Sequence, residues 1–298
     1  MMGQETTPAI QRDPFTIRTA DGVALVGERW LAAGRPKASL VLSHGYAEHI
    51  GRYEHVLKPL AVNRFAIYAA DHRGHGKSDG ERALIDRFDR YVDDLDLVVS
   101  RARQEQGGKP CYLVGHSMGG LIALRYALAH PDKIDALVLS APAIKPTQDA
   151  SRAQEAALRL LAKIAPGTPV VPSQEGVLSS DPEVEARAKR DPLFYNGKVK
   201  AGQAVELVDA GREVLKRAGQ LRMPLLILHG TDDGLVDPKG SEQLYLLTNN
   251  RPGVDTSLVT WPGMKHELLN EPDGEQVLGV IIAWLNGHYV EWRKAQPV

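Results

Sequence analysis

Short apolar runs alternate along the chain with longer stretches in which apolar residues recur at helical spacing. The apolar runs predict strands at residues 15–19, 23–30, 39–43, 65–69, 111–114, 136–140, 225–229 and 256–261. The longer stretches predict helices at residues 53–62, 88–103, 121–127 and 274–291. Asp21-Gly22 separates the first two strands and indicates a hairpin turn. Short apolar strands that alternate with helices are typical of a parallel sheet with helices on both faces, so we expect an α/β fold.

Residues 143–221 break this alternation. They are rich in Ala, Arg, Glu, Pro and Lys, and they contain no clear strand. Within them, residues 156–165 place apolar side chains on one broad face of a predicted helix. One interpretation is a set of ordinary helices packed in the core. We favour a helical cap inserted into a core made of residues 1–142 and 222–298, because an insertion after a strand of a parallel sheet overhangs the strand ends.

The overall composition is that of an ordinary globular protein. The chain has 298 residues, of which 43% are hydrophobic and 24% are charged, and its formal net charge is −1. This balance argues against binding to nucleic acid. Residues 1–14 are polar, and no apolar run is long enough to span a bilayer, so we expect a cytoplasmic protein without a secretory signal. The single cysteine, Cys111, cannot form an internal disulfide, and its apolar strand predicts that it is buried.

The most informative motif is Gly-His-Ser-Met-Gly-Gly at residues 115–120. It lies between a predicted strand and a predicted helix, which is the setting of a nucleophile elbow. Side chains two residues before and after the nucleophile would collide with the backbone of so tight a turn, and Gly115 and Gly119 avoid this collision. We therefore expect Ser117 to lie on a strained backbone with its hydroxyl exposed as a nucleophile.

A serine hydroxyl needs a base within hydrogen-bonding distance, and the base needs a carboxylate that orients it. In folds with this elbow the chain order is Ser, then Asp or Glu, then His. His266 lies in the loop after the last predicted strand, where the base is expected. Three aspartates, Asp232, Asp233 and Asp237, follow the strand before it, and their positions alone do not separate them.

Two further loops follow predicted strands. The backbone N–H of Met118 and that of Tyr46, in the loop after residues 39–43, are the expected donors of an oxyanion hole. The polar loop at residues 71–78 lacks the spacing of a phosphate-binding loop, and we interpret it as a structural loop beside the site. His72 and His75 in this loop lack the further ligands that a metal site needs, so we expect no metal.

Taken together, these motifs resemble the monoacylglycerol lipases of the α/β-hydrolase superfamily. Residues 43–53 read Ser-His-Gly-Tyr-Ala-Glu-His-Ile-Gly-Arg-Tyr and closely resemble the first signature of that family. The segments at residues 71–78, 115–120, 229–233 and 266–267 follow in the same order as in the family. The likeness spans residues 15–287, and the first signature is far more specific than the elbow. The resemblance implies an α/β-hydrolase fold with a mostly parallel central sheet, helices on both faces and a helical cap.

The resemblance also implies roles for individual residues. It makes Asp233 the acid of a catalytic triad with Ser117 and His266, and it supports Tyr46 and Met118 as the oxyanion hole. It places four more residues near the polar end of a substrate: Glu48, Arg52, His116 and Tyr195. Glu48 and Arg52 could equally form an ion pair that holds the oxyanion loop, which is the loop after residues 39–43 that contains Tyr46. Family members often carry a Tyr-Asn pair before Asp-Pro-Leu in the cap, whereas here Tyr195 follows Asp191-Pro192-Leu193.

The resemblance implies hydrolysis of monoacylglycerols to glycerol and fatty acid through an acyl-enzyme on Ser117, with no cofactor. A general carboxylesterase or lysophospholipase with the same triad is an alternative, and a non-catalytic binding protein on the same scaffold ranks last. The expected partner is a small lipid ester, with transient contact between the cap and a membrane or micelle surface. The sequence leaves the oligomeric state open, a homodimer included.

Overall fold

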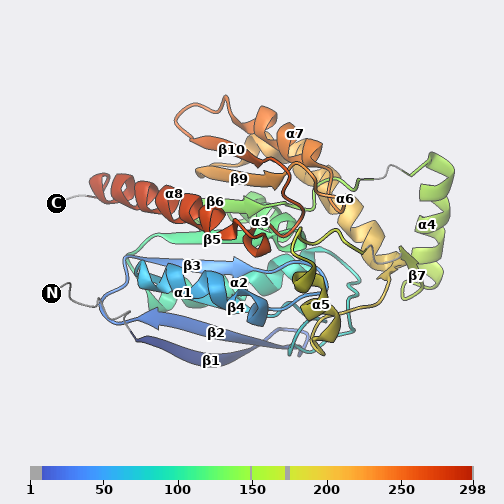
Figure 1. The fold of residues 1–298 in the computed structure, drawn as a ribbon, viewed down its shortest axis with the longest axis horizontal. Helices are drawn as coiled ribbons and strands as arrows, with labels where there is room; N and C mark the ends of the chain where they lie inside the picture. The colour runs from blue at the N-terminus through green and yellow to red at the C-terminus, as the bar shows by residue number, and fades with distance from the viewer. Residues whose placement is uncertain (1–8, 148–149, 172–174, 297–298) are drawn as a thin grey trace.

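An eight-stranded sheet forms the centre of the molecule. The computed structural model describes residues 9–147, 150–171 and 175–296 (Figure 1). The strand order is β1-β2-β4-β3-β5-β6-β9-β10. β1 and β2 form an antiparallel hairpin, β2 pairs antiparallel with β4, and all other pairs are parallel. The strands are β1 (Ile10–Arg18), β2 (Ala24–Ala32), β3 (Ala38–Ser43), β4 (Phe65–Ala70), β5 (Cys111–His116), β6 (Ala136–Ser140), β9 (Leu225–Gly230) and β10 (Thr256–Trp261).

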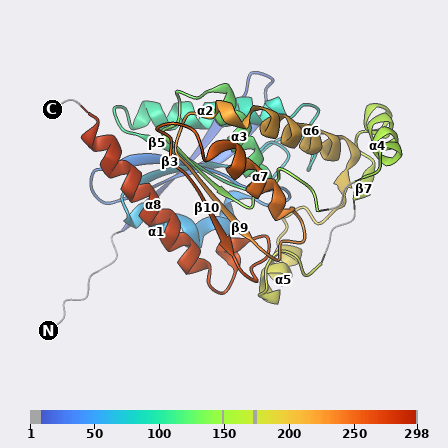
Figure 2. The same cartoon turned by 90° about the horizontal axis from the view of Figure 1, so that it is seen from above.

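Helices cover both faces of this sheet (Figure 2). α1 (Glu54–Val62) and α8 (Gly274–Lys294) pack on one face, and α2 (Asp89–Glu105), α3 (Met118–Ala129), α6 (Ala201–Arg217) and α7 (Pro238–Thr248) on the other. Successive strand residues point to opposite faces of the sheet. Leu40 and Leu42 therefore pack in the core beneath α1 and α8, while Val41 packs in the core beneath α2 and α3. Both faces need apolar residues, which is why the strands are nearly all apolar. Short 3₁₀ helices occur at η1 (Ile50–Tyr53), η2 (Ala218–Gln220) and η3 (Leu268–Asn270).

The sequence predictions for this core are confirmed at the level of elements. Each predicted strand and helix outside residues 143–221 has a counterpart in the structure, and Cys111 is fully buried. The helix α7 was not predicted, because its first half, from Pro238 to Gln243, is almost entirely polar. The polar residues 1–14, from which we expected no secretory signal, lie largely outside the described residues. Within the described part of the chain, no helix combines the length and hydrophobicity that a membrane crossing requires.

The segment between β6 and β9 is mainly helical. It contains α4 (Arg152–Ile164), α5 (Pro182–Arg190) and α6, as well as a short antiparallel pair of β7 (Pro169–Val171) and β8 (Val199–Lys200). We expected no clear strand in this segment, and the structure has this short pair. Strands of two and three residues are too short to show an alternating pattern, so the sequence could not reveal them.

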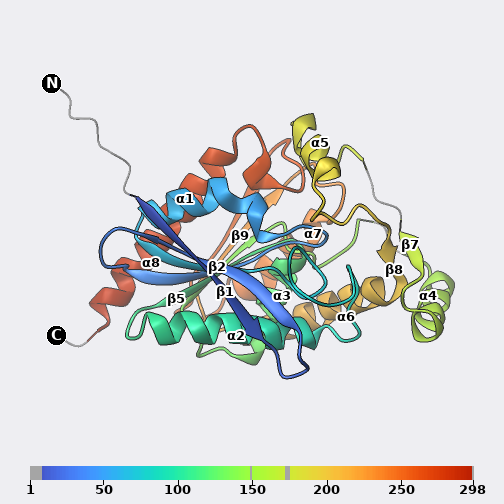
Figure 3. The ribbon, with the colours of Figure 1, turned by 90° about the horizontal axis from the view of Figure 1, so that it is seen from below.

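Within this segment, α4 and α5 have different surroundings. α5 lies beside the carboxyl ends of the strands, whereas α4 stands at the far end of the molecule, away from the sheet (Figures 1 and 3). None of the side chains of α4 is buried, and Leu160 and Ile164 are 60% and 74% exposed. The predicted apolar helix is thus confirmed, but much of its apolar face meets solvent instead of the core.

Candidate active site

Ser117 occupies the turn between β5 and α3. Its φ of +52° and ψ of −120° are strained for a residue with a side chain. A Cβ atom on Gly119 would lie 2.1 Å from the Ser43 carbonyl oxygen, and one on Gly115 would lie 2.5 Å from the Gly119 carbonyl oxygen. The two glycines are therefore sterically required, as the nucleophile-elbow interpretation predicts.

The structure brings Ser117, His266 and Asp233 into one hydrogen-bonded chain. The Ser117 Oγ atom lies 2.8 Å from His266 Nε2, and His266 Nδ1 lies 2.7 Å from Asp233 Oδ2. All three residues are buried. Of the other two candidate acids, Asp232 is exposed and bonds Thr231, while Asp237 caps the first turn of α7. The geometry therefore singles out Asp233 as the carboxylate that can orient His266.

Electrostatics within this chain favour a charged carboxylate beside a basic imidazole. Burial alone would raise the pKa of Asp233, but His266, the hydrogen bond from His229 and backbone N–H groups together hold that pKa below its ordinary value. Burial alone would lower the pKa of His266, but the charge of Asp233 raises it above the ordinary value. His266 is thus strengthened as a base that can take the proton of Ser117.

Two backbone N–H groups beside Ser117 are suited to stabilise an oxyanion. Met118 is the first residue of α3, where N–H groups have no partner within the helix. Tyr46 lies in the loop after β3, in which Ala47 adopts a φ of +69°. Neither N–H donates a hydrogen bond to another of the described residues. Their role as an oxyanion hole stays a prediction.

Glu48 and Arg52 form a buried ion network that supports the oxyanion loop. Glu48 Oε1 accepts hydrogen bonds of 2.5 Å from both the Gly45 N–H and the Tyr53 hydroxyl. Arg52 Nη1 donates to Glu48 Oε2 at 2.9 Å and to Glu267 Oε1 at 2.8 Å, and Nη2 donates to Glu267 Oε2 at 2.8 Å. Arg52 thus joins the oxyanion loop to the residue after His266. These contacts match the structural alternative for Glu48 and Arg52.

His116 contacts His266, and Tyr195 contacts the loop after β3. The His116 ring is 4.9 Å from the His266 ring, and its Nδ1 lies 3.1 Å from the Ser140 carbonyl oxygen. Burial and the neighbouring His266 lower the pKa of His116 to about 3, so it is neutral at physiological pH. The Tyr195 N–H donates to the Ala47 carbonyl oxygen at 2.7 Å, which attaches this part of residues 143–221 to the oxyanion loop.

The loop at residues 71–78 is structural, as its sequence indicated. The Asp71 carboxylate accepts N–H groups of Ile50 and Lys77, each at 2.8 Å. Burial lowers the pKa of His72 to about 3 and that of His75 to about 4. Across residues 9–147, 150–171 and 175–296, no three His, Cys, Asp or Glu side chains are grouped so that they could hold a metal ion.

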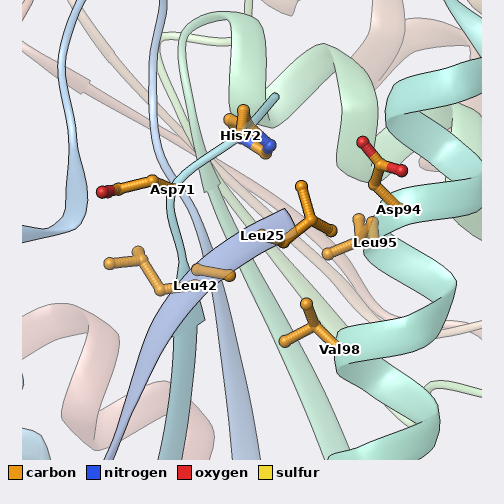
Figure 4. Close-up of a pocket in the computed structure, with 8 residues that line it drawn as sticks. Leu25, Leu42, Asp71, His72, Asp94, Leu95 and Val98 are labelled. Atoms are coloured by element: carbon orange, nitrogen blue, oxygen red, sulfur yellow. The ribbon is translucent and has the colours of Figure 1, made fainter. Parts of the chain in front are cut away.

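A small pocket lies between this loop and α2. Figure 4 shows Leu25, Leu95 and Val98 facing one another there, with the carboxylate of Asp71 turned away from them. Asp94, on the rim, is already paired with Arg73 through two hydrogen bonds of 2.6 Å. We therefore interpret this pocket as a packing gap and not as a binding site.

One side chain that contacts the triad acid was not among the predicted site residues. His229, at the end of β9, places Nε2 3.1 Å from Asp233 Oδ2, and its Nδ1 lies 2.7 Å from Ser241 Oγ on α7. A signal was available, because His229 is a polar residue at the carboxyl end of an apolar strand, where sites in such sheets lie.

The chain is similar to known lipases along most of its length. Residues 34–273 match the family described as serine aminopeptidase, S33. A monoacylglycerol lipase from Mycolicibacterium smegmatis is 38% identical over 277 residues, which cover 93% of this chain and 98% of the relative. A monoglyceride lipase from Rattus norvegicus is 33% identical over 270 residues, covering 90% of this chain and 88% of the relative. The crystal structure of a Paleococcus ferrophilus monoacylglycerol lipase has a TM-score of 0.78 at 30% identity, covering 89% of this chain and 99% of that one.

The matched region and the fold lead to the same assignment. The match includes Ser117, Asp233 and His266, together with the loops that hold them. The mostly parallel eight-stranded sheet flanked by helices is the α/β-hydrolase fold, which confirms the expected architecture. The chain therefore belongs to the serine aminopeptidase S33 family of α/β-hydrolases, as a monoacylglycerol lipase-like serine hydrolase.

Proposed function

We propose that this protein hydrolyses monoacylglycerols to glycerol and fatty acid through an acyl-enzyme on Ser117. The observation that carries this proposal is the continuous chain of hydrogen bonds from Ser117 through His266 to Asp233, with distances of 2.8 and 2.7 Å. The similarity to lipases that act on monoacylglycerols supports the choice of substrate.

The reaction proceeds in two halves. Ser117 Oγ attacks the acyl carbonyl while His266 Nε2 accepts its proton, and the Tyr46 and Met118 N–H groups stabilise the oxyanion. The tetrahedral intermediate collapses, the ester bond breaks, and glycerol leaves with the proton from His266. His266 then takes a proton from water while the water oxygen attacks the acyl carbonyl. The bond between Ser117 Oγ and the acyl carbon breaks, His266 returns the proton to Ser117 Oγ, and the fatty acid is released.

In this proposal the surroundings of Ser117 divide into a polar and an apolar side. The glycerol group lies toward His116 and Tyr195, and Glu48 and Arg52 act by holding the oxyanion loop. The cap predicted at residues 143–221 covers the acyl chain with the segment before α6, because α6 itself packs against α3 in the core. The exposed Leu160 and Ile164 of α4 contact the surface of the membrane or micelle that contains the lipid, because exposed apolar side chains on an amphipathic helix favour such an interface.

Two measurements test the function. The first compares the wild type with Ser117→Ala, in which turnover is expected to fall by roughly 10⁴- to 10⁶-fold while the thermal melt is unchanged. The second measures kcat/KM on monoacylglycerols, p-nitrophenyl esters, triacylglycerols and lysophospholipids. The proposal requires the highest value on a monoacylglycerol.

Two results would contradict the proposal. A folded Ser117→Ala protein with wild-type esterase activity excludes the mechanism. The highest kcat/KM on short aryl esters or on lysophospholipids, with little activity on monoacylglycerol, keeps the mechanism but replaces the substrate by that of a general carboxylesterase or lysophospholipase.

A further inference from the structure

His229 contacts the same carboxylate oxygen of the triad acid as His266. Asp233 Oδ2 accepts from His266 Nδ1 at 2.7 Å and lies 3.1 Å from His229 Nε2. The other oxygen, Oδ1, accepts the N–H groups of Leu235 at 2.8 Å and Val236 at 3.0 Å. An ionised carboxylate offers about four acceptor positions, and here all four are used. The orientation of Asp233 is thus fixed by four donors, one of which is a second histidine.

Chemistry determines which nitrogen of His229 carries the proton. An ionised carboxylate can only accept a hydrogen bond, so Nε2, which faces Asp233, must be the N–H donor. In the neutral ring Nδ1 then has a lone pair, and it accepts the hydroxyl hydrogen of Ser241 at 2.7 Å. The opposite tautomer would turn the Nε2 lone pair toward the Asp233 oxygen, which is repulsive. The carboxylate of Asp233 therefore selects the tautomer of His229, and the Ser241 hydroxyl satisfies the Nδ1 lone pair that this tautomer leaves.

Neither His229 nor Ser241 has access to water that could replace these bonds. The His229 side chain and the Asp233 side chain are both fully buried, and Ser241 is 1% exposed. Loss of the His229 donor would leave a carboxylate lone pair unsatisfied in an apolar surrounding, which is costly. Ser241 belongs to α7, so the position of this helix is coupled to the triad acid.

We propose that His229, whose ring is anchored through Nδ1 by the Ser241 hydroxyl, is a positioning residue that acts on catalysis through Asp233. The proposal rests on the proposed function, because it assumes that Asp233 orients His266 for ester hydrolysis. His229 touches no reacting atom. It fixes Oδ2, and Oδ2 in turn fixes the ring of His266 against Ser117, so the expected effect is on kcat and not on substrate binding.

The test compares His229→Leu, His229→Gln and Ser241→Ala with the wild type. We measure kcat and KM on a soluble p-nitrophenyl ester, with active enzyme counted by fluorophosphonate labelling. His229→Leu removes the N–H donor, and the kcat of this variant is expected to fall roughly 10- to 100-fold at unchanged KM. His229→Gln has a side-chain N–H that can reach Asp233, and this variant is expected to retain most of the wild-type kcat. Ser241→Ala is expected to reduce kcat less than His229→Leu, because it removes the anchor of the His229 ring and leaves the Nε2–H donor in place.

Ser39→Ala is the matched control for Ser241→Ala. Ser39 is equally buried, at 1% exposed, and it lies on β3, where its hydroxyl is 3.4 Å from the Pro110 carbonyl oxygen. Its kcat should equal that of the wild type. A folded His229→Leu protein with wild-type kcat overturns the proposal, and so does a His229→Gln protein as impaired as His229→Leu, because either result leaves no role for the donor. If His229→Leu does not fold, wild-type kcat in Ser241→Ala overturns it instead.

A second readout separates this proposal from the proposed function. The proton between His266 Nδ1 and Asp233 gives a low-field ¹H NMR resonance, which needs no turnover. We expect it to shift or broaden in His229→Leu and to return in His229→Gln. An unchanged resonance in His229→Leu contradicts the positioning role. A wild-type protein that shows the resonance but hydrolyses no monoacylglycerol contradicts the substrate assignment alone.

Discussion

At the scale of single residues, the protonation of His266 decides when the site can react. Its imidazole must be neutral to accept the Ser117 proton, and the charge of Asp233 raises its pKa above the ordinary 6.5. A raised pKa moves the acid limb of the activity profile to higher pH. We therefore expect kcat/KM to rise with pH through a limb centred above pH 6.5, measured on an uncharged soluble ester.

The raised pKa of His266 depends on the charge of Asp233, which a substitution can remove. In Asp233→Asn the burial of His266 remains, and burial lowers its pKa, so the acid limb is expected to move to lower pH. Its kcat is expected to fall by roughly 10⁴-fold, because the amide no longer selects the correct tautomer. The neighbouring Asp232 is exposed and serves as the matched control, since Asp232→Asn should change neither quantity. An acid limb that stays in place in Asp233→Asn would contradict this account of the His266 pKa.

At the scale of elements, α4 differs from the helices that pack on the sheet, because none of its side chains is buried. Leu160 and Ile164 of α4 are exposed. The described contacts of α4 are mainly with α6, and Arg159 of α4 forms an ion pair with Asp209 of α6. By contrast, the stretch at residues 177–180 is bonded to the loop of the catalytic base. The Glu267 N–H donates to the Leu178 carbonyl oxygen at 2.7 Å, and the Ser180 N–H donates to Glu271 at 3.0 Å. The exposed apolar surface thus belongs to α4, whereas the hydrogen bonds to the loop of His266 belong to residues 177–180.

This difference leads to a prediction for α4. The double variant Leu160→Ser, Ile164→Ser should lose activity on monoacylglycerol in vesicles, by roughly the contribution of two apolar side chains to interfacial binding, each about 1–2 kcal/mol. Activity on a soluble aryl ester should be unchanged. Leu246→Ser on α7 is the matched control, because Leu246 is 68% exposed on another helix. Equal losses on vesicles and on the soluble ester would show that α4 does not act at the lipid surface.

The elements that the sequence predicted are those with a repeated local pattern. The strand at residues 225–229 and the helix at 88–103 were recognisable because burial on one or two faces leaves an apolar pattern. β7 and β8 were not, because three and two residues carry no period. Their pairing depends on contacts between distant residues, which no local pattern records.

At the scale of the whole molecule, the site joins pieces from distant parts of the chain. Ser117 and His266 are 149 positions apart, and the elbow, the acid loop and the base loop meet only because β5, β6, β9 and β10 are neighbours in the sheet. Chain order and residue type sufficed to predict Ser117 and His266. The choice of Asp233 over Asp232 and Asp237 needed the family resemblance, because all three aspartates lie in one loop and only the fold shows which faces His266.

The same core contains four buried histidines whose pKa values burial lowers, namely His44, His72, His75 and His116. Each is neutral in the folded protein and gains a proton on unfolding when the pH is below about 6.5. Their contribution to stability is therefore fully present above pH 6.5 and is lost as the pH falls toward the folded-state pKa. The pKa values of His266, Glu48, Asp71 and Asp94 are raised in the folded protein. These four groups therefore contribute more to stability as the pH falls.

A single substitution isolates one of these contributions. His75→Phe keeps the ring contacts with Tyr46 and Tyr91, at 5.6 and 6.5 Å between centroids, and removes a group with a pKa of about 4. It also loses the hydrogen bond to the Arg73 carbonyl oxygen, a cost that does not depend on pH. The free energy of unfolding of the variant relative to wild type should rise by about 2 kcal/mol from pH 7.5 to pH 5, measured by urea unfolding, because the other groups cancel in the difference. A constant difference across this range would mean that His75 is not held neutral by the fold.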